Sequence, residues 1–275
     1  MADGQPTYSR TLVSYIDILG FADLIKDSQT GTDGVRMIIR LLTTMKDEFS
    51  IGGRVHRRPD GRTEKIFQSF NFSDLIVRTT RIPAGADIGQ YLDWELFYLG
   101  EKQLSLAVEG HLVRGGISMG QLFVGDRASI LFGPALVRAY KLESEKAVYP
   151  RILVDASLKR EAEQDTYDQD WKDYIHRGED GEYFLDYLFG PVITGLTVPA
   201  DGDPRPQVGE HRKMIEDKIQ NEIQQKDERT RQKYRWLALY HNAALRRLID
   251  RLGSPANHLL PNAQQYILPE DLLEF

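Results

Sequence analysis

The order of strand-like and helix-like segments constrains the fold of this chain more than any other feature of its sequence. Residues 11–18 (TLVSYIDI) are apolar and β-branched, and they predict a strand. Residues 34–49 place apolar side chains at helical spacing and predict a helix. The other elements predicted in the same way are a helix over 22–27, two strands in 65–80, a helix over 87–109, a hairpin in 111–125, a helix over 132–149 and a strand over 150–155. Because hairpins occur beside helical crossovers, the sequence predicts an α+β fold with a mixed or antiparallel sheet flanked by helices.

The composition of the chain changes after residue 158. Residues 161–177 are polar and predict a helix, and residues 210–252 predict one long charged helix. Within that long helix, one face repeats apolar residues and must pack against something; its members are Trp236, Leu237, Tyr240, Ala244, Leu245 and Leu248. We therefore predict a core domain over 1–158 and a mostly helical extension over 159–275, packed on the core or on a dimer partner.

Composition and charge exclude several classes of protein. The chain has no cysteine, which excludes disulfides, thiolate nucleophiles and Cys-type metal sites. The net charge of −6 gives no support for binding a nucleic-acid polymer. No stretch is apolar enough to span a membrane and no secretion signal is apparent, so we expect a cytoplasmic protein without a membrane partner. Neither a GxGxxG motif nor a Walker lysine motif occurs, which removes the main support for Rossmann and P-loop folds.

Two aspartates lie where acidic residues are unfavourable. Asp17 ends an apolar strand just before a glycine, and Asp74 interrupts the apolar segment SFNFSDLIV. A buried carboxylate needs a partner, and two carboxylates on adjacent strands with a backbone carbonyl would suit Mg²⁺ or Mn²⁺. The alternative is that each aspartate caps a turn or a helix, which is a common role for Asp beside Gly. The spacing alone leaves both interpretations open.

Four motifs in order resemble those of the class III nucleotidyl cyclases. YIDILGF resembles their first metal motif and FNFSDLIV their second metal strand, with Ser73 in place of the usual glycine. VRGGISMGQLFVG resembles the glycine-rich hairpin of the family, and FGPALVRAYKLES resembles its dimerisation helix. The resemblance covers roughly residues 14–155, and it implies a cyclase-like fold with a ferredoxin-like core and a helical C-terminal extension.

The departures from the family pattern concern the base and the transition state. The family's transition-state Asn and Arg fall on Val137 and Lys141, and its two purine-reading positions fall on Phe70 and Ile130. Neither Phe nor Ile can hydrogen-bond a base. A smaller, less polar pocket would suit a pyrimidine, and the chain is similar to the pyrimidine nucleotide cyclases of the bacterial Pycsar antiphage system. For Phe70, an ordinary place in the core is an equal alternative to contact with the base.

The resemblance implies a role for each motif residue in converting UTP, or alternatively CTP, to a 3′,5′-cyclic nucleotide and pyrophosphate. Asp17 and Asp74, with the carbonyl of Ile18, would hold two Mg²⁺ or Mn²⁺ ions. Lys141 would stabilise the charge on the α-phosphate, and Arg138 could substitute for it. The backbone N–H groups expected to bind phosphate, where Gly20 allows close approach, are those of Leu19, Gly20 and Phe21. Phe70 is the residue expected to line the base pocket.

The resemblance also implies partners. Class III cyclases of this kind are homodimers in which one subunit supplies the metal aspartates and the other the transition-state residue. The cyclic nucleotide would act on a separate effector protein as an antiphage signal. Three alternatives stay open: a purine cyclase, a polymerase-like relative that joins nucleotides, and a degenerate homologue that binds a nucleotide without turning it over.

Overall fold

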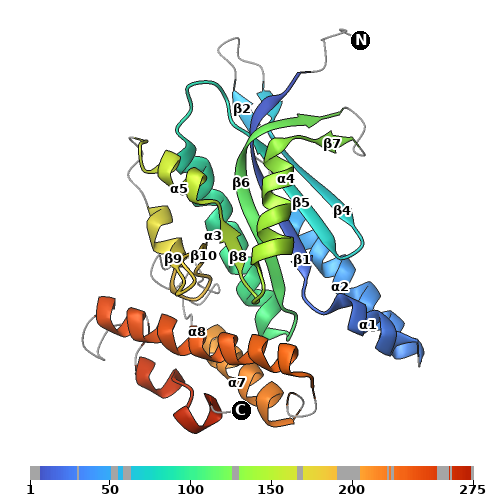
Figure 1. The fold of residues 1–275 in the computed structure, drawn as a ribbon, viewed down its shortest axis with the longest axis vertical. Coiled ribbons are helices and arrows are strands. Elements are labelled where there is room, and N and C mark those ends of the chain that lie inside the picture. Colours follow the sequence, from blue (N-terminus) through green and yellow to red (C-terminus); the bar gives the residue numbers. More distant parts are fainter. Residues whose placement is uncertain are drawn as a thin grey trace. The chain divides into compact units, whose positions relative to one another are not determined.

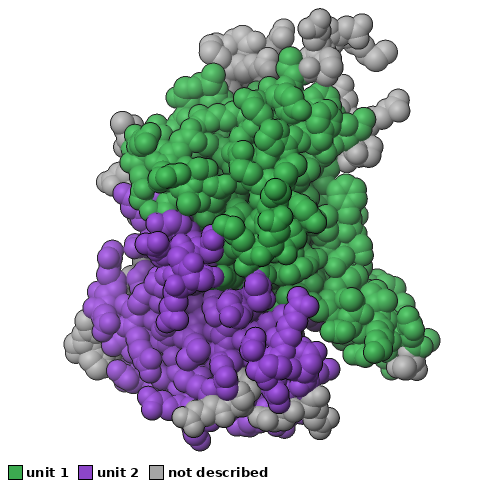
Figure 2. All heavy atoms as spheres, viewed as in Figure 1, with its two compact units in different colours: residues 1–92, 113–147, 151–167 green, residues 93–112, 148–150, 168–275 purple. Residues whose placement is uncertain are grey.

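The computed structural model describes residues 7–29, 31–50, 55–57, 63–125, 130–165, 170–190, 205–221, 223, 226–252, 260 and 262–273. The chain divides into two compact units, coloured separately in Figure 2. Unit 1 contains residues 1–92, 113–147 and 151–167, and unit 2 contains residues 93–112, 148–150 and 168–275. Residues 93–112 and 148–150, which precede the predicted boundary at residue 158, therefore belong to unit 2.

A mixed sheet forms the centre of unit 1 (Figure 1). Its strand order is β4-β5-β1-β6-β8, with the short strand β7 paired to the end of β6. All these pairs are antiparallel except β6 with β8, which is parallel. The strands are β1 (Ser9–Ile18), β4 (Phe67–Phe72), β5 (Leu75–Arg81), β6 (Val113–Val124), β7 (Leu131–Phe132) and β8 (Ile152–Val154). The α+β class and the mixed sheet predicted from the sequence are confirmed.

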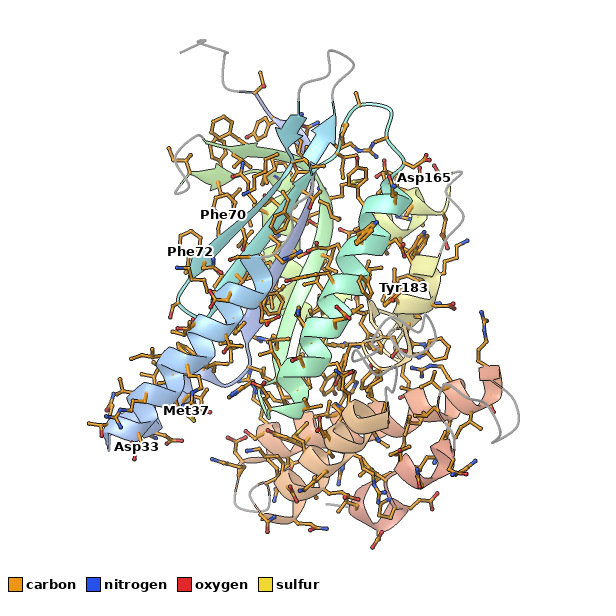
Figure 3. All side chains as sticks on the ribbon, turned by 180° about the vertical axis from the view of Figure 1, so that it is seen from behind. Asp33, Met37, Phe70, Phe72, Asp165 and Tyr183 are labelled. Carbon is orange, nitrogen blue, oxygen red and sulfur yellow. The ribbon has the colours of Figure 1, made fainter. Side chains whose placement is uncertain are left out.

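Helices cover both faces of this sheet. Val77 of β5 packs in an apolar cluster with Ala135 and Ala139 of α4 (Pro134–Lys141). The next residue, Arg78, donates a hydrogen bond of 2.6 Å to the carbonyl of Phe49 in α2 (Thr32–Ser50). Because successive strand residues face opposite sides of a sheet, α4 and α2 lie on opposite faces. Figures 1 and 3, which view the molecule from opposite sides, show the two helices in this arrangement.

Gly116 of β6 allows α4 to pack closely on the sheet. A Cβ added to Gly116 of β6 would lie 2.3 Å from the carbonyl oxygen of Ala139 and 2.6 Å from Cβ of Leu142. Pro134 occupies the first turn of α4, as the sequence predicts, where its missing N–H costs nothing. The helix then continues as a π-helical turn, η1 (Leu142–Lys146). Gly116 thus allows this helical segment to approach the backbone of the central strands.

The predicted helices before residue 110 are confirmed. They are α1 (Phe21–Ser28), α2 and α3 (Ile88–Val108). In α2 the buried positions are Ile38, Leu41, Met45 and Phe49. A separate two-stranded sheet pairs β2 (Val55–Arg57) with β3 (Thr63–Lys65). The hairpin predicted within 111–125 is wrong in detail, because β6 runs through these residues as one continuous strand and its return strand is β7.

The elements that follow β8 differ from the sequence prediction. α5 (Ala156–Ala162) contains only the first two residues of the predicted helix over 161–177. That stretch ends instead in a 3-10 helix, η2 (Asp170–Tyr174), and in β9 (Ile175–Arg177), so the helix prediction is wrong. The side chains of Trp171 and Tyr174 are fully buried, and this burial replaces the solvated helix that the polar composition indicated.

Unit 2 consists mainly of helices. β9 pairs antiparallel with β10 (Tyr183–Leu185). The single helix predicted over 210–252 is wrong, because the structure has two, α7 (Arg205–Asn221) and α8 (Glu228–Leu252). Two 3-10 helices follow, η4 (Ala263–Tyr266) and η5 (Glu270–Leu273).

The apolar face predicted within 236–248 is confirmed in α8. Its buried members are Leu237, Tyr240, Ala244, Leu245 and Leu248. Leu245 and Leu248 share an apolar cluster with Val208 of α7 and with Ala263 of η4. No helix in the described part of the chain combines the length and the apolar character needed to cross a membrane.

Candidate functional site

The topology of the sheet brings Asp17 and Asp74 together. Asp17 of β1 stands in register with Leu75 of β5, and Phe72 pairs with Leu75 across the β4–β5 hairpin. The hairpin loop therefore contains only Ser73 and Asp74, so Asp74 directly precedes the partner of Asp17. The two carboxyl groups lie close enough to interact through charge and through a hydrogen bond when one is protonated. The convergence expected from the sequence is present in the structure.

Arg114 and Glu143 complete the charged group. Asp17 also stands in register with Arg114 of β6, whose Nε and Nη2 both lie 3.3 Å from Oδ2 of Asp17. The same Nη2 lies 2.7 Å from Oε1 of Glu143 in η1. The side chain of Glu143 is only 5% exposed, whereas those of Asp17 and Arg114 are 22% and 24% exposed. Two elements of the sheet and the π-helical turn thus hold one guanidinium between two carboxylates.

Burial and negative charge raise the pKa values of the acidic groups in this cluster. Burial, the main cause, and the neighbouring Asp74 raise the pKa of Asp17, against the opposing effect of Arg114. Burial also raises the pKa of Glu143, with further contributions from Asp17 and Asp74. The pKa of the Tyr15 phenol is raised by burial and then by Glu143 and Asp17. Three mutually interacting carboxyl groups, two of them paired with a single guanidinium, leave an excess of negative charge that favours an added cation.

The oxygen donors at this place fit a hard divalent cation in chemical type. Asp17 and Asp74 offer carboxylates, and the predicted contribution of the Ile18 carbonyl stays a prediction. No group of three or more His, Asp and Glu side chains with metal-holding geometry occurs among the residues that the structure describes. The candidate site therefore depends on two carboxylates, with water and phosphate oxygens needed to fill the coordination shell.

The turn after β1 has an open backbone at Gly20. Gly20 precedes α1 in a left-handed conformation with φ of 84°, and a Cβ added there would meet nothing within 4 Å. Leu19 is partly exposed and Phe21 is buried. The acidic side chain of Asp23 lies in the first turn of α1 and weakens its attraction for an anion. The predicted phosphate-binding turn is thus accessible at Gly20 but carries an opposing charge.

The two predicted cations of α4 differ in their surroundings. Arg138 donates a hydrogen bond to the carbonyl of Met119, and its Nε lies 3.7 Å from Oδ2 of Asp155. Lys141 is exposed, and within the described residues its side chain makes neither a hydrogen bond nor an ion pair. Lys141 is therefore the more available of the two for a ligand.

The structure places Phe70 in the core, the alternative that the sequence left open. Phe70 is 4% exposed and packs with Val13 and Val77 beneath α4. Phe72, two residues along β4 and on the same face, is 49% exposed (Figure 3). Ile130 is 48% exposed. Contact between Phe70 and a base stays a prediction, and Phe72 is the accessible aromatic ring next to Asp74.

Sequence reasoning missed Glu143 and the tyrosines of the cluster. Glu143 lies in the motif KLES, but nothing in its spacing indicates burial. Tyr15 and Tyr140 meet edge to face with ring centroids 5.6 Å apart beside the acidic cluster. Arg114 pairs with acids that are partly or almost fully buried. The apolar strand context of Arg114 was the available signal for such burial.

Comparison with known proteins adds no assignment. No model of a known protein family matches the chain, and no curated protein matches it.

Proposed function

We propose that this chain is a nucleotidyl cyclase with a class III cyclase-like fold that converts UTP to 3′,5′-cyclic UMP and pyrophosphate. One observation carries the proposal: Asp17 and Asp74, at the end of β1 and in the β4–β5 loop, meet beside the open turn at Gly20. The proposal explains why an acidic residue, Asp17, ends an otherwise apolar strand next to a second acidic residue in the neighbouring loop. It also explains an excess of negative charge that Arg114 alone does not neutralise.

Asp17, Asp74 and the carbonyl of Ile18 would hold Mg²⁺ or Mn²⁺. When bound, the two ions lower the pKa of the ribose 3′-hydroxyl and neutralise the phosphates. The chain's own residues bind and orient the substrate around that point. The backbone at Leu19, Gly20 and Phe21 receives phosphate oxygens.

The reaction is an intramolecular transfer of the α-phosphoryl group. The 3′-oxygen forms a bond to the α-phosphorus, the bond from that phosphorus to the β-phosphate oxygen breaks, and the hydroxyl proton passes to water. Lys141 stabilises the negative charge that develops on the α-phosphate. Its exposed position on α4 suits a role toward the site of a second copy of the chain. We therefore propose a homodimer in which Lys141 of one copy faces the aspartates of the other.

The choice of nucleotide depends on the residues around the base rather than on the aspartates. Phe70 is buried, and the accessible aromatic ring on the same strand is Phe72, so a pyrimidine that binds beside Asp74 would contact Phe72. CTP is the alternative pyrimidine substrate, and a purine triphosphate is the alternative outside that class. The proposed product acts on a separate effector protein in the cytoplasm, as in the antiphage systems that the motifs resemble.

A second candidate function is nucleotide binding without turnover. The observation in its favour is that Val137 and Lys141 replace the Asn and Arg of active cyclases, and Val137 is 52% exposed without a polar group. Retention of both aspartates, close enough for Asp74 to raise the pKa of Asp17, opposes this candidate.

The experiment is a screen of the purified chain with each of the four nucleoside triphosphates and Mn²⁺, with products identified by mass spectrometry. We expect cyclic UMP and pyrophosphate from UTP, and loss of both in Asp74→Asn. The matched control is Asp33→Asn, at an exposed position near the start of α2 (Figure 3), which should keep full activity. Linear dinucleotides as products would indicate a polymerase-like enzyme. Tight nucleotide binding without pyrophosphate release would favour the non-catalytic candidate.

A further inference from the structure

Arg114 pairs with two acidic side chains at once, and its guanidinium cannot approach both of them equally closely. Its Nη2 contacts Glu143 at 2.7 Å and Asp17 at 3.3 Å, so movement toward one carboxylate lengthens the contact with the other. The shorter contact is with Glu143, the more deeply buried acid. Among the residues that the structure describes, none donates to Oε1 of Glu143 in hydrogen-bond geometry, so the 2.7 Å contact with Arg114 is an ion pair of close charges. Arg114 thus divides its charge between the two acids: it donates two hydrogen bonds of 3.3 Å to Oδ2 of Asp17 and forms the shorter ion pair with Glu143.

The backbone fixes Glu143 in this position. The π-helical turn η1 closes with a hydrogen bond of 2.9 Å from the N–H of Ala147 to the carbonyl of Leu142. Leu142 and Glu143 are buried, while the three residues that follow them are exposed. Leu142 also packs against Gly116 of β6, which ties the turn to the sheet. Single π-helical turns occur frequently at functional sites, where they direct one side chain inward.

We propose that Glu143 is a positioning residue: by holding Arg114 it weakens the pairing of Arg114 with Asp17, and so leaves Asp17 available to bind a divalent cation together with Asp74. This inference rests on the proposed function and concerns the same site. A cation on Asp17 must compete with the guanidinium of Arg114, because both are attracted to the same carboxylate, whose Oδ2 already accepts two hydrogen bonds from Arg114. Glu143 biases that competition without itself binding the cation.

The test measures binding of Mn²⁺ to the full chain without nucleotide, by titration calorimetry. We expect Glu143→Gln to weaken Mn²⁺ binding about tenfold, the usual scale for loss of an outer partner of a metal ligand. Arg114→Gln should tighten binding about fivefold, because it removes one positive charge near the carboxylates. In the Arg114→Gln background, Glu143→Gln should not weaken Mn²⁺ binding further, because the arginine that Glu143 holds is already absent.

The alternative is that the negative charge of Glu143 attracts the cation directly, without acting through Arg114, and it predicts a different result. Glu143→Gln would then weaken Mn²⁺ binding equally with and without Arg114, and that outcome overturns the inference. The matched control is Glu145→Gln, which removes one charge from an exposed position on the same turn and should leave the affinity unchanged. If Arg114→Gln fails to fold because Glu143 is left buried without a counter-ion, Arg114→Lys replaces it. The loss caused by Glu143→Gln should shrink in that background as well, because lysine lacks the planar fork.

Two failures are distinguishable. If Asp74→Asn leaves the Mn²⁺ affinity of the wild-type chain unchanged, the ion does not bind at the aspartate pair, and both the proposed function and this inference fail. If Mn²⁺ binding depends on Asp74 but Glu143→Gln binds as tightly as the wild type, the inference alone fails.

Discussion

Ser73 has an unusual backbone conformation for a residue with a side chain. Its φ is 57°, in the left-handed region, and Asn262 is the only other non-glycine residue in the described chain with a positive φ. Because the β4–β5 loop has only two residues, one of them must turn the chain sharply, and glycine does so without steric cost. Ser73 thus carries strain in the loop that positions Asp74.

We therefore predict that Ser73→Gly stabilises the protein. The expected gain is about 0.5 to 1 kcal/mol in the free energy of unfolding, the difference between relief of left-handed strain and the greater freedom of glycine in the unfolded chain. Urea unfolding followed by circular dichroism measures it. Ser73→Ala keeps the Cβ and should give no gain. Equal stabilisation by both substitutions would show that the hydroxyl, and not the backbone, is responsible.

Individual residues of the site were predictable from sequence to different degrees. Asp17 and Asp74 could be found because acidic side chains within apolar stretches of sequence are costly to bury unless they have a function or a partner, although the structure places Asp74 in the β4–β5 loop. Glu143 could not be found, because its burial depends on a π-helical turn and on the approach of α4 to Gly116. The core position of Phe70 was one of two open interpretations, because an aromatic residue on a strand suits a core and a binding pocket equally.

At the scale of elements, strands and helices with strong periodicity were predictable, but the boundary between α7 and α8 was not. The segment from Asn221 to Glu228 contains neither Gly nor Pro, so no breaker marks the end of α7. The side chain of Asp227 accepts a 2.8 Å hydrogen bond from the N–H of Thr230 and starts α8. Because Asp residues also occur inside long charged helices, the presence of Asp227 alone did not indicate that one helix ends and another begins.

A chain of buried hydrogen bonds joins α7, α8 and η4 in unit 2. Nε2 of His241 lies 2.9 Å from the carbonyl of Tyr266, which can only accept, so this nitrogen carries the proton. With His241 neutral, its Nδ1 accepts from Nδ1 of His211 at 3.0 Å. Nε2 of His211 then accepts from the Tyr187 hydroxyl, also at 3.0 Å. Each imidazole is neutral in one tautomer, and an added proton on either ring would break a bond of the chain.

This arrangement predicts a loss of stability in acid. Burial lowers the pKa of His241 to about 4 and that of His211 well below its usual value. Histidines in the unfolded chain have pKa values near 6.5. Between about pH 6.5 and pH 4 the unfolded state therefore binds protons that the folded state does not, and the free energy of unfolding decreases as the pH is lowered. His241 alone accounts for about 2 kcal/mol lost by pH 5.

Urea unfolding at pH 7 and pH 5 tests this prediction. The difference in unfolding free energy between the two pH values should shrink in His241→Asn, and it should stay at the wild-type value in the exposed control Asp33→Asn. An unchanged difference in His241→Asn would show that His241 does not titrate in this range. The raised pKa values of Asp17 and Glu143 act in the opposite sense, since protonation of these groups favours the folded state as pH falls.

At the scale of the whole molecule, one feature agrees with assembly into the proposed homodimer. The α4 helix exposes Val137 and Tyr140, which are 52% and 48% exposed, beside the exposed Lys141. Exposed apolar side chains on one helix face are typical of interaction surfaces when several occur together. Tyr140 contacts Tyr15 of the acidic cluster, so this face adjoins the candidate site.

A site shared between two copies predicts complementation of inactive variants. Asp74→Asn removes a carboxylate from one half of each site, and Lys141→Met removes the cation from the other half. Mixed in equal amounts and allowed to exchange subunits, they should form heterodimers in half of the population, each with one intact site of two. The mixture should therefore recover about a quarter of wild-type activity.

Asp74→Asn mixed with Asp17→Asn should recover none, because both substitutions damage the same half of the site. Recovery in neither mixture, from variants shown by light scattering to exchange subunits, would place Lys141 outside a shared site.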